Sequence, residues 1–207
     1  MRSDKADRNS YGTSNLSLID RFGTWLSRGV IRRSIGERSG LKVLEIGCGC
    51  QAKNLLAIQD RTTAMVGCDF NIAPEVKRLK GFEAIEQPAE IALPTLKDRS
   101  FDVVMLISVL EHLSDPLGML SACSQMLAPG GRLLVNVPTW RGKYFLELTA
   151  FLLGLSPNGK IEMDDHKMYY DKRDLWPLLV RAGFAPSRIH LHYHKFGLNL
   201  FAAADNP

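Results

Sequence analysis

Short apolar runs between Leu41 and Pro138 are separated by segments of mixed polarity. Each run is apolar without alternation, as in strands buried on both faces of a parallel sheet, and the runs lie at 41–47, 63–69, 101–108 and 131–138. Helices fit between them, and alternating strands and helices imply right-handed crossovers. The pattern therefore predicts an α/β fold with a doubly wound, Rossmann-like, mostly parallel sheet and helices on both faces.

Capping signals define two further helices. Asp115 and Pro116 suit the N-cap and first helical position of a helix over 116–127, and Gly183 suits the end of a helix over 171–183. Two closing strands near 187–195 and 198–204 are separated only by a tight turn at Gly197. The short connection predicts that they pair antiparallel.

The first 40 residues carry a polar tail and then a predicted helix over 15–35, whose apolar positions recur at three and four. One interpretation is a cover helix on a sheet edge. The other is a basic amphipathic helix that rests on an anionic membrane surface through Arg21, Arg28, Arg32 and Arg33. We expect this region (1–40) to precede a domain over 41–207.

Residues 139–170 form a predicted lid-like insertion in that domain. An apolar helical piece spans 144–155, and it is followed by a turn at 156–159 and an acidic stretch that ends at His166. Phe145, Leu146, Phe151 and Leu152 would meet an apolar acceptor or, alternatively, pack against the last helix.

Composition narrows the class of protein. The 207 residues have a net charge of +4, but the excess lies in the first 40 residues, and the rest of the chain is balanced. The residues after position 40 have no net charge and no basic stripe, which argues against a nucleic-acid partner. Four cysteines make no disulfide framework, which favours a cytoplasmic location, and the longest apolar-rich run is too short to span a membrane.

A glycine loop follows the first predicted strand. Gly47 and Gly49 allow a sharp turn and close approach to a ligand, and with Ala52 they also satisfy the dinucleotide pattern G-x-G-x-x-A. Two acids add specificity: Glu45 precedes the loop, and Asp69 ends the second strand, where a carboxylate accepts both hydroxyls of a ribose. A carboxylate inside the loop repels a diphosphate but suits a ligand with an ammonium and a sulfonium.

With these residues the chain resembles the class I S-adenosylmethionine-dependent methyltransferases, in particular those with a Methyltransf_11-type domain. The matching pieces occur in the family's order: VLEIGCG (43–49), GCDFN (67–71), the segment 88–116 that contains FDVVMLISVLEH, and LAPGGRLLVNVP (127–138). The chain departs from the family pattern at Gln51, where a third glycine is usual, and at Pro88, where Asp is common. Pro88 offers no N–H or carboxylate to an adenine amine.

The resemblance implies S-adenosylmethionine as cofactor. It places Glu45, Gly47, Cys48 and Gly49 around the methionine portion, Asp69 at the ribose and Phe70 beside the adenine. It also places Ala89 and Glu90 at the adenine end, and Ile107 and Ser108 beneath the cofactor at the end of a strand.

Methyl transfer from a sulfonium needs alignment of donor and nucleophile, and a hydroxyl or ammonium acceptor must also lose a proton. His112, just past the strand that ends near Ser108, and His166 in the insertion are the candidate catalytic residues. The predicted activity is methyl transfer to a small-molecule, glycan or lipid-precursor acceptor, with oxygen favoured. The alternatives are an inactive S-adenosylmethionine-binding module, suggested by Gln51 and Pro88, and a nicotinamide-dependent oxidoreductase.

No metal site is expected from the sequence. His190, His192 and His194 alternate on one strand face, but no carboxylate or thiol joins them in sequence. The Cys48-Gly49-Cys50 pair supplies too few ligands and is interpreted as loop packing.

Overall fold

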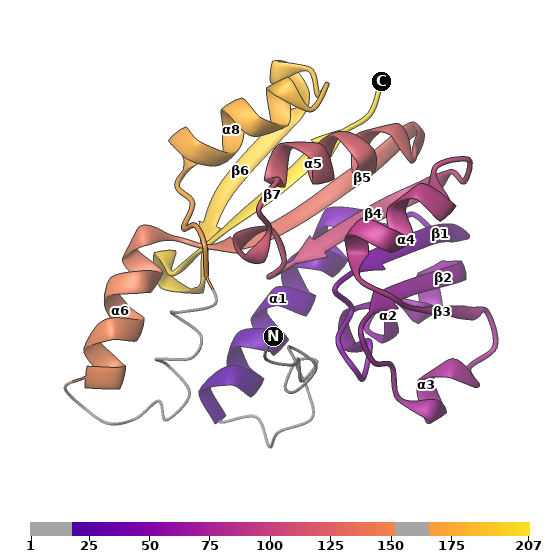
Figure 1. Cartoon of the computed structure of the whole chain (residues 1–207), viewed down its shortest axis with the longest axis horizontal. Coiled ribbons are helices and arrows are strands. Elements are labelled where there is room, and N and C mark those ends of the chain that lie inside the picture. Colours follow the sequence, from indigo (N-terminus) through magenta and orange to yellow (C-terminus); the bar gives the residue numbers. More distant parts are fainter. Residues whose placement is uncertain (1–17, 152–165) are drawn as a thin grey trace, which may run out of the picture. The chain divides into compact units, whose positions relative to one another are not determined.

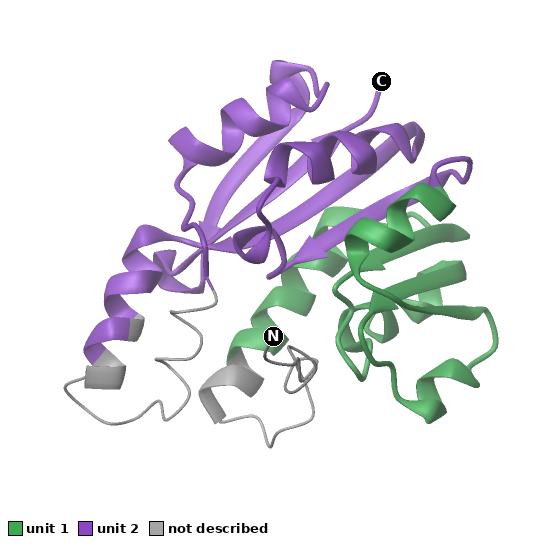
Figure 2. Ribbon diagram, in the orientation of Figure 1, with its two compact units in different colours: residues 1–96 green, residues 97–207 purple. Residues whose placement is uncertain are grey.

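The computed structural model describes residues 18–151 and 166–207. They form two compact units, one ending at Leu96 and the other beginning at Lys97 (Figure 2). The boundary falls between a helix and the strand that follows it.

The first unit contains three parallel strands in the order β3-β2-β1 (Figure 1). Their bounds are β1 Leu41–Ile46, β2 Thr62–Asp69 and β3 Phe82–Glu86. Its helices are α1 Leu18–Ile35, α2 Lys53–Leu56, the 3-10 turn η1 Gln59–Arg61, α3 Pro74–Lys77 and α4 Ala89–Leu96. Val43, Leu44 and Ile46 are fully or almost fully buried, as their unbroken apolar run predicts.

The second unit has the strand order β4-β5-β7-β6. The strands are β4 Phe101–Ile107, β5 Leu127–Pro138, β6 Ile189–His194 and β7 Asn199–Asp205. β4 and β5 are parallel, whereas β7 is antiparallel to both β5 and β6. The helices are η2 Leu110–His112, α5 Pro116–Gln125, α6 Trp140–Phe151, α8 Lys172–Arg181, η3 Pro186–Arg188 and η4 Lys195–Gly197, and α5 and α8 pack side by side (Figure 1).

The predicted fold class is confirmed: the protein is an α/β structure whose strands are mostly parallel, with an antiparallel strand near the C-terminus. The caps are confirmed as well, because the Asp115 carboxylate accepts a hydrogen bond of 2.9 Å from Gly118 N–H and α8 ends two residues before Gly183. The strand β3 was missed. It is only partly buried along its length, so its side chains do not form the apolar run that marks the other strands.

The helix α1 packs into the protein along one face. Val30, Ile31 and Ile35 are buried, and the Arg32 guanidinium makes a bidentate pair with Asp60 at 2.8 and 2.6 Å. These contacts favour the cover-helix interpretation. Contact with a membrane surface stays a prediction.

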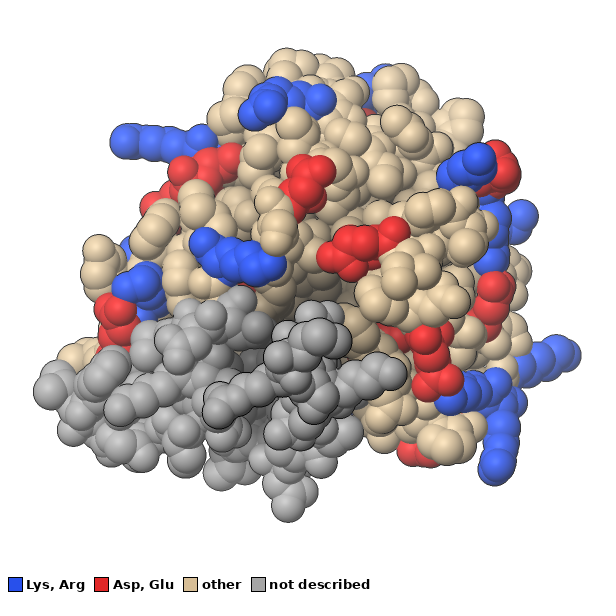
Figure 3. Space-filling model, in the orientation of Figure 1, with Lys and Arg blue, Asp and Glu red and all other residues tan. Residues whose placement is uncertain are grey.

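Charged side chains of both signs are interspersed on the face drawn in Figure 3, where the described residues show no continuous basic stripe. Within the described part of the chain, none of the helices combines the length and the hydropathy needed to cross a membrane. Of the predicted insertion, the structure describes α6 and the residues from His166 onward. The turn at 156–159 and the acids Glu162, Asp164 and Asp165 lie outside the described residues.

Candidate functional site

The loop after β1 is fixed to the end of β2 by backbone hydrogen bonds. The N–H groups of Gly47 and Cys48 both donate to the carbonyl of Cys68, at 2.8 and 3.2 Å. Gly47 and Gly49 each have φ of 72°, a left-handed conformation that favours glycine. The loop therefore presents bare backbone where the sequence predicts a ligand.

Asp69 holds the same loop through its side chain. Its Oδ2 accepts a hydrogen bond of 2.7 Å from Gly49 N–H, and its Oδ1 accepts one of 2.7 Å from Phe70 N–H. Each carboxylate oxygen has a second lone pair, so acceptor capacity remains. Asp69 lies at the last position of β2, opposite Glu86 at the last position of β3, and Phe70 is 46% exposed beside it.

Glu45 is a buried carboxyl beneath this loop. Its side chain is inaccessible to solvent; Oε1 accepts a hydrogen bond of 2.8 Å from the Asn54 amide, and Oε2 has no hydrogen-bond partner among the described residues. Burial raises the pKa of Glu45 to about 8, against the opposing hydrogen bonds from Asn54 and the Leu55 backbone. A neighbouring cation would lower this pKa and favour the ionised carboxylate of Glu45.

The cysteines near the loop are buried thiols. Cys48, Cys50, Cys68 and Cys123 are all free and buried, which confirms that they form no disulfide framework. Burial raises the pKa of Cys48, and it raises the pKa of Cys68 to about 11. Protonated thiols are poor nucleophiles and metal ligands, so Cys48 contributes packing and backbone position.

Gln51, Ala52 and Pro88, which the sequence analysis singled out, each have a defined contact or conformation in the structure. The Gln51 amide donates to Glu75 Oε1 at 3.2 Å and so connects the loop with α3. Ala52 has φ of 43° and precedes a helix of only four residues, unlike the long helix that a dinucleotide loop opens. The Pro88 carbonyl accepts from the N–H groups of Ile91 and Ala92 and starts α4, which carries Ala89 and Glu90 in its first turn.

Ile107 and Ser108 end β4 in the second unit. Ser108 has φ of 58°, uncommon for a residue with a side chain, and its N–H donates to the Asn136 carbonyl at 2.9 Å. The buried Asn136 amide also reaches Ser108 Oγ at 3.4 Å, and Asn136 Oδ1 lies 2.6 Å from His194 Nε2. Sequence reasoning missed Asn136 and His194 as supports of Ser108, because no pattern along the two strands shows that these side chains meet.

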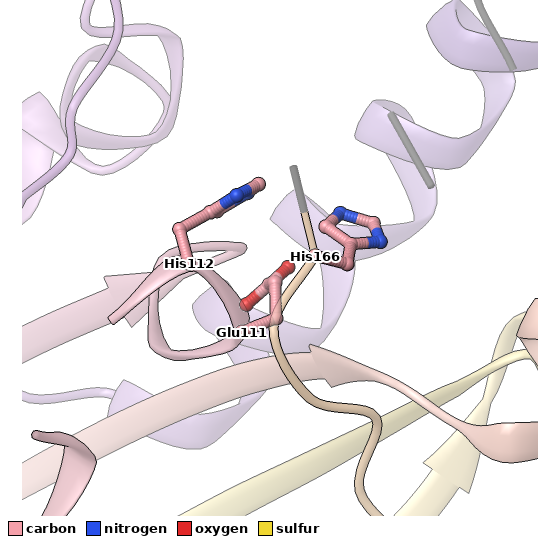
Figure 4. A group of neighbouring side chains, drawn as sticks. All are labelled: Glu111, His112 and His166. Atoms are coloured by element: carbon pink, nitrogen blue, oxygen red, sulfur yellow. The ribbon is translucent and has the colours of Figure 1, made fainter. Parts of the chain in front are cut away.

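The two candidate catalytic histidines come together in the second unit (Figure 4). His112 ends η2, His166 precedes α8, and their ring centroids are 4.8 Å apart at an interplanar angle of 56°. Glu111 completes the group, which we call the Glu-His-His cluster. One potential ligand atom from each of its residues lies within 4.8 Å of the others.

Glu111 is the buried member of the cluster. Its side chain is 1% exposed, and Oε2 has no hydrogen-bond partner among the described residues. Burial raises the pKa of Glu111 to about 8, and the charge of Lys195 acts in the opposite direction. Glu111 was not among the residues singled out from the sequence, since nothing in the pattern shows that its side chain is buried.

Two hydrogen bonds from Lys167 hold the segment at His166 beside η2 and the loop that follows it. The Lys167 N–H donates to the Glu111 carbonyl at 2.8 Å, and the Lys167 ammonium donates to Ser114 Oγ at 2.7 Å. The phenol of the buried Tyr169 lies 3.1 Å from His166 Nδ1. The ring is therefore held through Nδ1.

The remaining predicted features are arranged differently. His190 and His192 are exposed on β6, and His194 is engaged with Asn136, so these three histidines make no cluster of metal ligands within the described chain. On α6, Tyr144 is 65% and Phe145 is 45% exposed. The side chains of Leu146, Phe151 and Leu152 lie outside the described ones, and the lid role stays a prediction.

Comparison with known proteins identifies the family. A family model described as a methyltransferase domain matches residues 16–188. The chain belongs to the methyltransferase domain family. This confirms the resemblance to class I methyltransferases inferred from the glycine loop and the motifs that follow it.

The curated relatives of this methyltransferase domain include ubiquinone biosynthesis O-methyltransferases. The one from Leptothrix cholodnii is 30% identical over 123 residues, which cover 56% of this chain and 52% of the relative. The one from Pseudomonas aeruginosa is 33% identical over 142 residues, which cover 60% and 59%. The match thus spans a little over half the length of these relatives.

Solved structures share the fold of this methyltransferase domain. An N-methyltransferase from Bradyrhizobium japonicum in complex with S-adenosyl-L-homocysteine has a TM-score of 0.61 at 15% identity, covering 98% of this chain and 94% of its own. Magnesium protoporphyrin IX methyltransferase from Synechocystis has a TM-score of 0.62 at 19% identity, covering 97% and 92%. At these identities the likeness establishes the fold.

Proposed function

We propose that this protein transfers a methyl group from S-adenosylmethionine to an oxygen atom of a small-molecule acceptor, with glycans and lipid precursors included in that class. The observation that carries the proposal is the convergence of His112 and His166, because a hydroxyl or ammonium acceptor must lose a proton when it is methylated. The O-methyltransferase relatives favour oxygen of these two acceptors. Membership in the methyltransferase domain family and the curated O-methyltransferase relatives support the proposal.

The residues of the first unit fit the proposed cofactor. Asp69 keeps free lone pairs for ribose hydroxyls at the end of β2, and Gly47 and Gly49 keep the backbone accessible. Oε2 of Glu45, which has no hydrogen-bond partner among residues 18–151 and 166–207, is an acceptor suited to a neighbouring ammonium group. We include Cys48, Phe70, Ala89, Glu90, Ile107 and Ser108 in the proposed cofactor site.

When bound, S-adenosylmethionine supplies a methyl group already activated by the sulfonium. The protein then has to align the acceptor oxygen with that methyl and receive or release the hydroxyl proton. We assign the proton to the Glu-His-His cluster, where His112 and His166 are partly accessible and Glu111 is buried. General acid–base help of this kind contributes about 10²- to 10⁴-fold to a rate.

The four free cysteines support a reducing compartment, and we propose a cytoplasmic location on that basis. Fractionation of the native source, with the protein detected by antibody, tests the location. Recovery in an oxidising compartment would contradict it.

The proposed activity is tested by calorimetric titration with S-adenosylmethionine, S-adenosylhomocysteine and NAD, followed by a screen of hydroxylated acceptors for S-adenosylhomocysteine production. We expect both sulfur ligands to bind, NAD not to bind, and Asp69→Ala to lose the binding. The matched control is Asp102→Ala on β4, a partly buried carboxylate outside the proposed cofactor site. Binding of NAD alone would overturn the proposal, and so would binding of the sulfur ligands with no turnover on any acceptor.

A further inference from the structure

The Glu-His-His cluster is built like a metal site. It combines two imidazole nitrogens and one carboxylate oxygen, contributed by η2 and by the segment that begins at His166. The ligand atoms are already within 4.8 Å of one another, so small side-chain rotations would bring them around one ion (Figure 4). Three protein ligands leave a coordination position for water or a substrate atom.

A second observation, at Glu111, points to a cation ligand. Glu111 is 1% exposed, and one of its carboxylate oxygens is buried with no hydrogen-bond partner in the described part of the chain. Burying such an oxygen unsatisfied is costly, and a bound cation removes that cost by accepting the lone pair. The same cation would favour the ionised carboxylate over the neutral form.

The surroundings of His166 resemble the outer shell of a metal site. Metal-binding histidines commonly use their second ring nitrogen to hold a partner that fixes the ring, and Tyr169 occupies that position at 3.1 Å from Nδ1. The hydrogen bond from the Lys167 N–H to the Glu111 carbonyl fixes the distance between η2 and the segment at His166. Nε2 of His166 is then the ligand atom.

We propose that Glu111, His112 and His166 bind one divalent first-row transition ion. Two nitrogens and one oxygen suit ions such as Zn²⁺ and Co²⁺ better than Mg²⁺ or Ca²⁺, which prefer sets of oxygen ligands. Lys195 is close enough to act on Glu111 electrostatically, and it competes with the ion for that carboxylate.

The role of the ion rests on the proposed function. A hydroxyl brought to the open coordination position has a lowered pKa and releases its proton to solvent, as metal-bound water does. The Glu-His-His cluster would then remove the proton through the ion, with His112 and His166 acting as its ligands in place of accepting the proton directly. The binding of the ion itself does not depend on methyl transfer and is measured without cofactor or acceptor.

The test uses untagged protein freed of metal with a chelator and titrated with Co²⁺, followed by visible absorption, with Zn²⁺ as competitor. We expect one ion per chain, displaced by Zn²⁺ and not by an equal concentration of Mg²⁺. His112→Ala and His166→Ala should each weaken binding by about tenfold or more, and Tyr169→Phe by about tenfold. His190→Ala, at an exposed histidine on β6, should bind like the parent protein.

Folding of each variant is checked by circular dichroism, and Glu111→Gln is read only as a supporting variant because its side chain is buried. Absence of Co²⁺ binding to the folded parent protein would overturn the proposal. Equal binding by the parent and both histidine variants would overturn it too, since the ion would then be held elsewhere. Metal binding without methyltransferase activity would reject the proposed function and leave the site in place.

Discussion

His112 and His166 lie with their ring centroids 4.8 Å apart although they come from different segments of the second unit. The Lys167 N–H, which donates to the Glu111 carbonyl at 2.8 Å, holds the two segments together beside them. The arrangement brings two titratable nitrogens and a buried carboxyl to one place. Such clusters are common where proteins move protons or bind cations.

Replacing either histidine should abolish most of the activity. We expect His112→Ala and His166→Ala each to lower the turnover number by about 100-fold or more, because either variant loses the group that removes the hydroxyl proton, directly or through the bound ion. The Kd for S-adenosylmethionine should change little. Initial rates and calorimetry measure the two quantities separately. The exposed His192→Ala on β6 is the control. Near-full turnover in both variants would remove the cluster from the mechanism.

The buried Glu45 should make the cofactor-free protein less stable as pH rises. Its pKa is raised from 4.5 to about 8 in the folded state, so its stabilising contribution is complete below about pH 4.5 and is lost as pH approaches 8. By linkage the loss is on the order of 4 kcal/mol. Urea unfolding between pH 5 and 8 should therefore show a smaller decline for Glu45→Gln than for the parent protein.

The control for this measurement is Glu37→Gln, at a carboxylate whose side chain is 97% exposed. It should follow the pH dependence of the parent protein. An identical decline in Glu45→Gln and the parent would show that Glu45 is ionised in the folded state. The raised pKa of Glu111 also lowers stability as pH rises. Because Glu111 is present in the parent protein and in both variants, its contribution is common to all three measurements.

Two glycines should respond oppositely to alanine. A Cβ at Gly67 on β2 would lie 2.7 Å from Phe82 Cζ and 2.9 Å from Cys48 Sγ, so Gly67→Ala overpacks the first unit and should cost about 1–3 kcal/mol. A Cβ at Gly29 in α1 meets no described atom within 4 Å. Gly29→Ala should stabilise the helix by about 0.5–1 kcal/mol. Thermal unfolding measures both changes.

Replacing Phe82 by the smaller leucine should recover part of the stability that Gly67→Ala loses. Phe82→Leu combined with Gly67→Ala is expected to lose less stability than the sum of the two single variants, because the leucine lacks the ring atom that the new methyl meets. Strict additivity would show that the cost arises elsewhere.

The cap of α5 should contribute measurably to the second unit. Asp115 accepts from the Gly118 N–H at 2.9 Å, and Asp115→Ala removes that bond at an expected cost of about 1 kcal/mol. Asp115→Asn keeps an acceptor and should recover most of the stability. A loss in both variants would point to the charge of Asp115 rather than to its hydrogen bond. Urea unfolding at fixed pH measures the difference.

The sequence alone determined the elements whose signals are local. Buried runs such as 43–46 exclude water from both faces, and the Asp115-Pro116 pair fixes a helix start through its own backbone geometry. The glycine loop was predictable for the same reason, because glycine adopts the left-handed φ found at 47 and 49 without steric cost. The edge strand 82–86 was missed because its half-buried pattern carries no such local signal.

Only the tertiary structure decided which distant side chains share an environment. The sequence marked His112 and His166 separately. The short distance between their rings depends on the backbone hydrogen bond from Lys167 to Glu111, which no sequence pattern encodes. Burial of the Glu45 and Glu111 carboxyls likewise depends on the packing of several segments around them. Local propensity acts over a few residues, whereas burial, and with it the charge state of a carboxyl, is a property of the whole surrounding shell.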